Sequence, residues 1–182
     1  MDTERSVIEV RRAVPGDEQA LAQVGQATFL ETFAGVLDGA DLLAHCSRQH
    51  TSEVYRDWLA DERVAIWLAT IAPGAAPVGY LVLTPPALPV ADPGPADVEI
   101  KRVYLLHRFQ GGGVGRRLLD TAIRHARERV ARRILLGVYA HNRDALAFYA
   151  RCGFRDVGER RFRVGDNEYD DRVLALDLVE QA

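Results

Sequence analysis

The feature that most constrains the fold is the stretch of residues 97–117, DVEIKRVYLLHRFQGGGVGRR. Its first half carries the β-branched and apolar residues of a mostly buried strand. The consecutive glycines 111–113 then allow a tight turn in which no Cβ keeps a ligand from the backbone. From Val114 the apolar residues recur at the spacing of an amphipathic helix. A glycine turn at the start of a helix brings together backbone N–H groups that have no partner within the helix. This stretch therefore predicts an anion-binding site, and phosphate is the usual ligand of such a site.

Spacing distinguishes three kinds of phosphate-binding loop. A Walker loop needs Lys and then Ser or Thr after its last glycine, whereas Gly115 is followed by two arginines. The dinucleotide fingerprint GxGxxG also fails, because its sixth position falls on Arg116 or Leu118 in the two frames. The pattern that is present is QxxGxG, which begins at Gln110.

A second motif, HNRDALAFYARCGF, occupies residues 141–154 and follows a predicted strand. Asn142 stands where it can cap a helix through its side chain. Tyr149 lies seven residues later, two helical turns away, so the two side chains share a face with Ala145.

Together the two motifs resemble the signatures of the GNAT superfamily of acetyl-CoA-dependent N-acetyltransferases, over residues 97–154. The resemblance implies acetyl-CoA as cosubstrate, no metal, and a small-molecule amine as acceptor. It also implies a set of cofactor-binding residues: the backbone of Val103, Tyr104 and Leu105 for the pantetheine arm, Gln110, Gly111, Gly112, Gly113, Val114, Gly115 and Arg116 for the pyrophosphate, and Asn142, Ala145 and Phe148 along the pantetheine.

Two residues are candidates for proton transfer. Glu99 lies eleven residues before Gln110, the offset of the catalytic glutamate in histone-type members, and is the candidate base. Tyr149 is the candidate acid, since a phenol of pKa about 10 can donate to a thiolate of pKa about 8.5. The plainer alternatives are a solvated strand-edge charge for Glu99 and a buried aromatic residue for Tyr149.

The order of predicted elements gives a mixed α/β sheet of the GNAT fold, with about seven strands and four to five helices, in a single domain over residues 1–182. The expected strands are 8–13, 64–71, 78–83, 97–106, 133–139, 155–164 and 169–178. The expected helices are 17–34, 40–61 with a break near His50, 114–130 and 142–152. Five prolines make residues 84–96 a surface loop.

Composition excludes several classes of protein. A net charge of −3 argues against general nucleic-acid binding, and no apolar run is long enough for a membrane span. The first six residues show no secretory signal, and two cysteines form no disulfide framework, so a cytoplasmic protein is expected. Cys46 and His50 have nominal metal spacing beside His45, but a packed helix face is the simpler reading.

The acceptor is the least constrained part of the prediction. Acidic residues outnumber basic ones on the first helices, which favours a cationic amine; an ordinary solvated helix surface is the equally good alternative. The phrases ATFLETFAG, EIKRVYLL and FRVGDNEYDDRVLALDL resemble PaiA-type polyamine acetyltransferases. The alternatives are a protein or peptide N-acetyltransferase and a non-catalytic acyl-CoA-binding sensor. The resemblance also implies pairing as a homodimer.

Overall fold

A computed structural model describes residues 7–179; the remaining ends of the predicted domain, 1–6 and 180–182, lie outside the described residues. The strands are β1 Ile8–Arg12, β2 Ala65–Ile71, β3 Ala76–Thr84, β4 Asp97–Leu105, β5 Arg133–Tyr139, β6 Arg155–Val164 and β7 Asn167–Asp177. The helices are α1 Glu18–Phe33, α2 Gly39–Gln49, α3 Ser52–Ala60, α4 Val114–Glu128 and α5 Arg143–Arg151, with a 3₁₀ turn, η1, at His107–Phe109.

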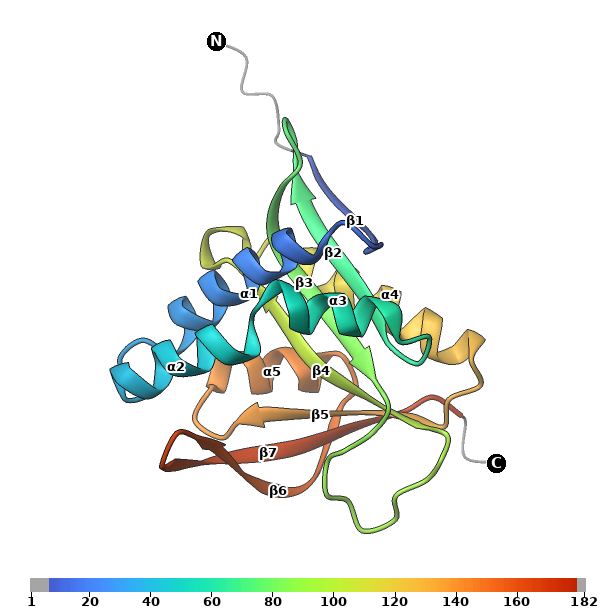
Figure 1. Cartoon of the computed structure of the whole chain (residues 1–182). Helices are drawn as coiled ribbons and strands as arrows, with labels where there is room; N and C mark the ends of the chain where they lie inside the picture. The colour runs from blue at the N-terminus through green and yellow to red at the C-terminus, as the bar shows by residue number, and fades with distance from the viewer. Residues whose placement is uncertain (1–6, 180–182) are drawn as a thin grey trace. The chain divides into compact units, whose positions relative to one another are not determined.

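The strands form a mixed sheet in the order β1-β2-β3-β4-β5-β7-β6 (Figure 1). β5 runs parallel to β4 and antiparallel to β7. Seven strands and five α-helices in the described residues confirm the predicted fold class. The predicted element bounds agree to within about two residues, but η1 was not predicted.

The chain folds as two compact units. The first contains residues 7–82 and 102–121. In it β1 pairs with β2 from Ile8 opposite Ile71 to Arg12 opposite Trp67. Its core joins α1 and α3 to β2 and β3, and includes Leu21, Val24, Tyr55, Ile66, Leu68, Tyr80 and Val82. Thr51 caps α3 by accepting a hydrogen bond from the N–H of Val54 at 3.3 Å, so the predicted break near His50 is confirmed.

The second unit contains residues 83–101 and 122–179. β5 pairs with β7 from Arg133 opposite Asp177 to Tyr139 opposite Asp171. β6 and β7 form a hairpin, drawn in orange to red in Figure 1. Leu88, from the proline-rich loop, packs with Leu135, Val173 and Ala175, so this loop has an apolar anchor in the core of the unit.

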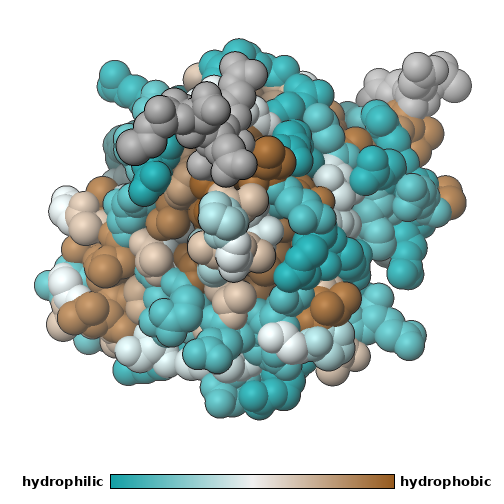
Figure 2. All heavy atoms as spheres, turned by 90° about the horizontal axis from the view of Figure 1, so that it is seen from above, coloured by the Kyte–Doolittle hydropathy of each residue, from teal (hydrophilic) through white to brown (hydrophobic). Residues whose placement is uncertain are grey.

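The amphipathic stripe predicted for α4 is confirmed. All of its predicted apolar members are buried: Val114, Leu118, Leu119, Ala122, Ile123 and Ala126. Elsewhere at the surface, hydrophobic and hydrophilic residues are interspersed on the face that Figure 2 shows.

Candidate functional site

The glycine turn before α4 has the backbone that the sequence predicts. Gly111 and Gly113 have φ values of +77° and +81°, in the left-handed region that favours glycine. A Cβ at either position would meet no protein atom within 4 Å, and one at Gly112 would meet only the carbonyl oxygen of Phe109, at 4.0 Å. The turn therefore presents bare backbone to open space, as a phosphate cradle requires.

Three residues with side chains lie next to this turn. The side-chain Nε2 of Gln110 donates to the carbonyl oxygen of Leu105 at 3.0 Å, which ties the turn to the end of β4. At the other side, Arg117 N–H donates to Gly113 at 3.0 Å and closes the first turn of α4. Arg116 is exposed and its Nε donates to Asp120 at 2.7 Å. The loop residues and the strand end predicted to hold the cofactor thus lie together in the first unit.

The end of β4 approaches β3 closely. A Cβ on Gly79 would lie 2.8 Å from the carbonyl oxygen of Tyr104 and 2.7 Å from Cδ1 of Leu105, so only glycine fits at this position. The Tyr104 ring stacks on Tyr80 with a centroid distance of 6.1 Å. Val103, Tyr104 and Leu105 are each half-buried. Glycine therefore sets the position of the strand end that is predicted to hold the pantetheine arm.

Glu99, the predicted base, is buried at 2% exposure in the second unit. Its Oε2 accepts hydrogen bonds from the backbone N–H groups of Ala87 and Leu88, at 2.7 and 3.1 Å. Its Oε1 lies 3.3 Å from Nζ of Lys101. The simple alternative of a solvated edge charge is wrong, because the carboxylate holds the middle of the proline-rich loop.

A second buried carboxylate, Asp97, fixes the end of the same loop. It accepts hydrogen bonds from Arg132 Nε, Arg133 Nη2 and the N–H of Gly94, each at 3.0 Å. Burial acts to raise the pKa of Asp97, but these donors outweigh burial and the pKa is lowered. The loop is therefore attached at two carboxylates of β4 and is part of the folded unit.

Helix α5 carries the second motif. Asn142 is its N-cap: Oδ1 accepts from the N–H of Ala145 at 3.1 Å, as predicted. Tyr149 is 8% exposed and packs edge-on against Phe148 and Phe154, with centroid distances of 5.3 and 5.6 Å. Ala145, Phe148 and Tyr149 of α5 and its N-cap Asn142 thus come from one short segment of the second unit.

A polar cluster that sequence reasoning missed lies in the first unit. Arg102 donates to the hydroxyl oxygen of Tyr55 at 3.0 Å, and that oxygen lies 3.0 Å from Nδ1 of His50. A guanidinium can only donate, so the Tyr55 oxygen accepts from Arg102, and the direction of its hydrogen bond with Nδ1 of His50 depends on the tautomer of the imidazole. Nε2 of His50 is buried and has no hydrogen-bond partner among the described residues. Burial lowers the pKa of His50 to about 2, helped by the charge of Arg102.

His45 and Cys46 belong to the same region. The ring of His45 stacks on Phe29 at 4.3 Å, and burial lowers its pKa to about 4. Cys46 is buried and its Sγ lies 4.0 Å from the carbonyl oxygen of Gln26. Across residues 7–179 no three His, Cys, Asp or Glu side chains are grouped closely enough to hold a metal ion.

Comparisons with known proteins bear on this arrangement. The sequence profile of the Acetyltransferase (GNAT) family matches residues 37–154, which contain both motifs. An uncharacterised N-acetyltransferase of Mycobacterium tuberculosis is 29% identical over 163 residues, which cover 90% of this chain and 99% of the relative. A spermine/spermidine N(1)-acetyltransferase of Bacillus subtilis is 35% identical over 66 residues, 36% of this chain and 43% of the relative.

Solved structures share the fold. The PaiA N-acetyltransferase of Thermoplasma acidophilum, in complex with coenzyme A, has a TM-score of 0.72 at 16% identity, with 94% of this chain and 99% of that chain covered. The ribosomal-protein-S18-alanine N-acetyltransferase of Escherichia coli has a TM-score of 0.65 at 18% identity, with 97% of each chain covered. Within the described part of the chain, no helix is both long and apolar enough to cross a membrane.

Proposed function

Because the chain belongs to the GNAT family of acetyltransferases, we propose that it moves the acetyl group of acetyl-CoA directly to a primary amine bound at the same time. The single observation that carries this proposal is the glycine turn before α4, whose Gly111 and Gly113 leave open space where any other residue would carry a side chain. Acetyl-CoA use follows from the family and fits this turn.

The residues of the turn fit a pyrophosphate by their chemistry. The first N–H groups of α4 have no acceptor within the helix and lie at its positive end, so they favour an anion. Arg116 lies in the same first turn and adds an exposed positive charge beside Asp120. In this proposal the backbone of Val103, Tyr104 and Leu105 holds the pantetheine arm, and Asn142 and Phe148 contact it.

Acetyl transfer then needs few groups. The amine nitrogen attacks the thioester carbonyl, a C–N bond forms, the C–S bond breaks, and the sulfur takes a proton. We assign the amine proton to Glu99, directly or through water, and the proton for sulfur to Tyr149. A backbone N–H near Leu105 is the proposed donor to the oxyanion. We further propose that residues 1–182 act as one acetyltransferase domain.

A polyamine is one candidate acceptor. Its support is the short match to the Bacillus subtilis spermine/spermidine acetyltransferase and the fold shared with PaiA. Acetylation of a protein or peptide is a second candidate, since the fold is also shared with the enzyme for ribosomal protein S18. We also propose a cytoplasmic enzyme, supported by two cysteines that form no disulfide.

We propose a weak homodimer, because GNAT proteins often pair through their closing strands and outer helices, and α1 and α2 carry exposed apolar side chains. Leu30 and Leu43 are 43% and 61% exposed. Light scattering over a range of concentrations tests the dimer, and a monomer at the highest concentration contradicts it.

The test of acetyl transfer is release of the CoA thiol, followed with a thiol reagent, in the presence of acetyl-CoA and a panel of amines. The panel contains polyamines, amino acids, aminoglycosides and peptides. We expect release that depends on the amine, with the acetylated amine identified by mass spectrometry. Tight CoA binding without release for any amine would instead indicate the non-catalytic sensor.

A further inference from the structure

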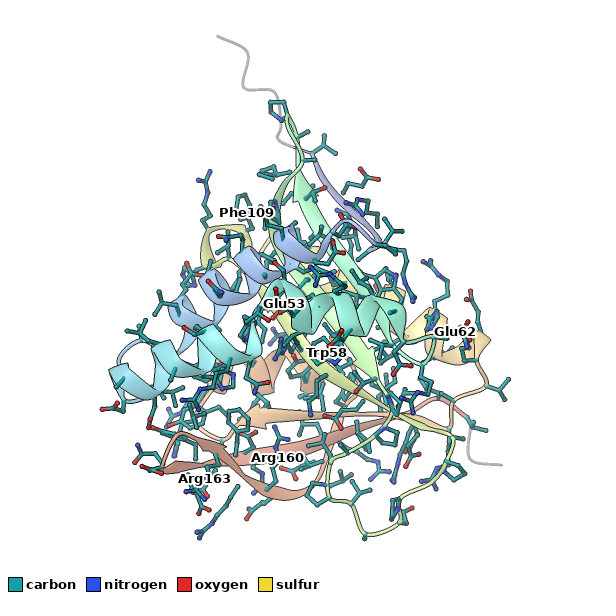
Figure 3. The ribbon with its side chains drawn as sticks, viewed as in Figure 1. Glu53, Trp58, Glu62, Phe109, Arg160 and Arg163 are labelled. Atoms are coloured by element: carbon teal, nitrogen blue, oxygen red, sulfur yellow. The ribbon has the colours of Figure 1, made fainter. Side chains whose placement is uncertain are left out.

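The guanidinium of Arg102 is held firmly in the first unit. Arg102 lies on β4, directly before the strand end that is proposed to hold the pantetheine arm. Its Cζ lies 4.6 Å from the ring centroid of Trp58 and 5.5 Å from that of Tyr55, and Nη1 donates to the Tyr55 hydroxyl at 3.0 Å. Trp58 and Tyr55 both come from α3, on which Figure 3 labels Trp58. The side chain is half-buried and has contacts that fix its orientation.

This cation has no carboxylate partner among residues 7–179. Ten other arginines of the described chain do pair with acids: Arg11, Arg63, Arg116, Arg132, Arg133, Arg155, Arg160, Arg161, Arg163 and Arg172. The titratable groups that face Arg102 are His45, His50, Tyr55 and Tyr80. Burial and the charge of Arg102 lower the pKa of both histidines, and burial raises the pKa of both tyrosines. All four are therefore uncharged near neutral pH, and the positive charge stays unbalanced.

An unbalanced, half-buried guanidinium with a fixed orientation is suited to one kind of ligand group. One of its five N–H donors is used by Tyr55, so a planar pair of donors remains for a bidentate carboxylate. Partial burial strengthens such a pair and equally strengthens repulsion of a cation. Successive strand residues rise by about 3.3 Å, so Arg102 lies within about 10 Å along β4 of Leu105.

We propose that Arg102 binds a carboxylate of the acceptor, so that the substrate class is an amine that also carries a carboxylate, such as an amino acid. This inference rests on the proposed acetyl transfer and gives its acceptor site a charge. Arg102 favours carboxylate-bearing acceptors over polyamines, which carry positive charge only. Arg102 thereby acts as a specificity residue, and none of the proton transfers passes through it.

The test compares amines that differ by one carboxylate: lysine with cadaverine, ornithine with putrescine, and phenylalanine with phenethylamine. For at least one pair we expect the wild-type kcat/KM to be at least tenfold higher for the carboxylated member. Arg102→Gln should lower kcat/KM for that member by about 10- to 100-fold, through KM, and leave its partner nearly unchanged. Arg56→Gln is the matched control, because Arg56 is an exposed arginine of α3. The dissociation constant of CoA should stay the same in both variants.

The inference would be overturned if no pair showed a preference for the carboxylated member, or if the Arg102→Gln enzyme kept the wild-type preference. A second measurement does not depend on turnover or on the folding of a variant. In the wild-type complex with CoA, NMR titration should show hexanoate binding more tightly than hexanamide. Equal binding of these two probes also overturns the inference. If no amine is acetylated but hexanoate is preferred, the proposed acetyl transfer fails and the carboxylate site stands.

Discussion

The buried imidazole of His50 should make this fold sensitive to mild acid. His50 is fully buried, and burial with the charge of Arg102 lowers its pKa to about 2, whereas an unfolded histidine titrates near 6.5. Below pH 6.5 the unfolded chain therefore binds a proton that the folded chain does not. Stability from the neutral ring is complete above pH 6.5 and is lost as the pH falls toward the folded pKa.

The size of this effect can be worked out for a convenient interval. Between pH 7 and pH 5 the unfolded histidine gains most of one proton, which favours unfolding by about 2 kcal/mol. The value holds for any folded pKa below about 4, so it does not depend on the depth of the shift. This change is a large part of the free energy of unfolding of a typical domain, which is ~5–15 kcal/mol.

The assay is urea denaturation at pH 7 and pH 5 for the wild type and His50→Asn. Asparagine has both a hydrogen-bond donor and an acceptor for the Tyr55 hydroxyl in place of Nδ1, but it does not titrate. The free energy of unfolding should fall between pH 7 and pH 5 by about 2 kcal/mol less in His50→Asn than in the wild type, whatever the stability of the variant at pH 7. His107→Asn, at an exposed histidine of η1, is the control. Equal losses in wild type and His50→Asn would refute the assignment of a neutral buried His50.

Three further predictions concern the proposed acetyl transfer. Gly112→Val should weaken CoA binding by tenfold or more in calorimetry, because the new side chain would occupy the open space of the turn. The fold should be kept, since the φ of Gly112 is not positive. Gly39→Val is the control: its side chain also enters open space, but away from the turn, so CoA binding should not change. Tyr149→Phe should keep the affinity for CoA and lower turnover by about a hundredfold. The loss of turnover should be smaller for a thioester whose leaving thiol is more acidic. An equal loss with every leaving thiol would show that Tyr149 is a packing residue. Glu99→Gln keeps one carbonyl oxygen for Ala87 and Leu88, so the melting temperature should hold while kcat falls; unchanged kcat would leave Glu99 with its structural role alone.

Local chemistry explains why much of the fold was predictable. The turn at residues 111–113 needs a positive φ at two positions, and glycine is the residue that adopts a positive φ most readily, so the glycines predict the turn. The break between α2 and α3 can be predicted because Thr51 is a typical N-cap residue and α3 begins after it. Asn142 predicts the start of α5 in the same way. The buried stripe of α4 follows from its spacing alone. In each case the residues that decide the structure lie within a few positions of one another.

Contacts between distant residues were not predictable. Gly25 lies in the middle of α1, where the sequence offers no reason for a glycine. A Cβ there would lie 2.4 Å from His50 Nδ1 and 2.5 Å from the Tyr55 hydroxyl, so the glycine makes room for a pair that lies 25 and 30 residues away. Likewise, nothing near Glu99 in the sequence shows that its carboxylate receives the N–H groups of Ala87 and Leu88.

The charge of the acceptor site shows the limit of counting residues. The acids that outnumber bases along the first helices predict a cationic acceptor, but several of them are already used locally. Glu31 accepts the N–H of His107 at 2.8 Å, Asp38 caps α2, and Asp61 pairs with Arg63 at 2.7 Å. Arg102 counts as a single charge in the sequence, but it is half-buried and forms no ion pair with an acid of the described residues. Because burial strengthens an electrostatic interaction and solvent weakens it, we expect Arg102 to contribute more to the choice of ligand than exposed or paired carboxylates do.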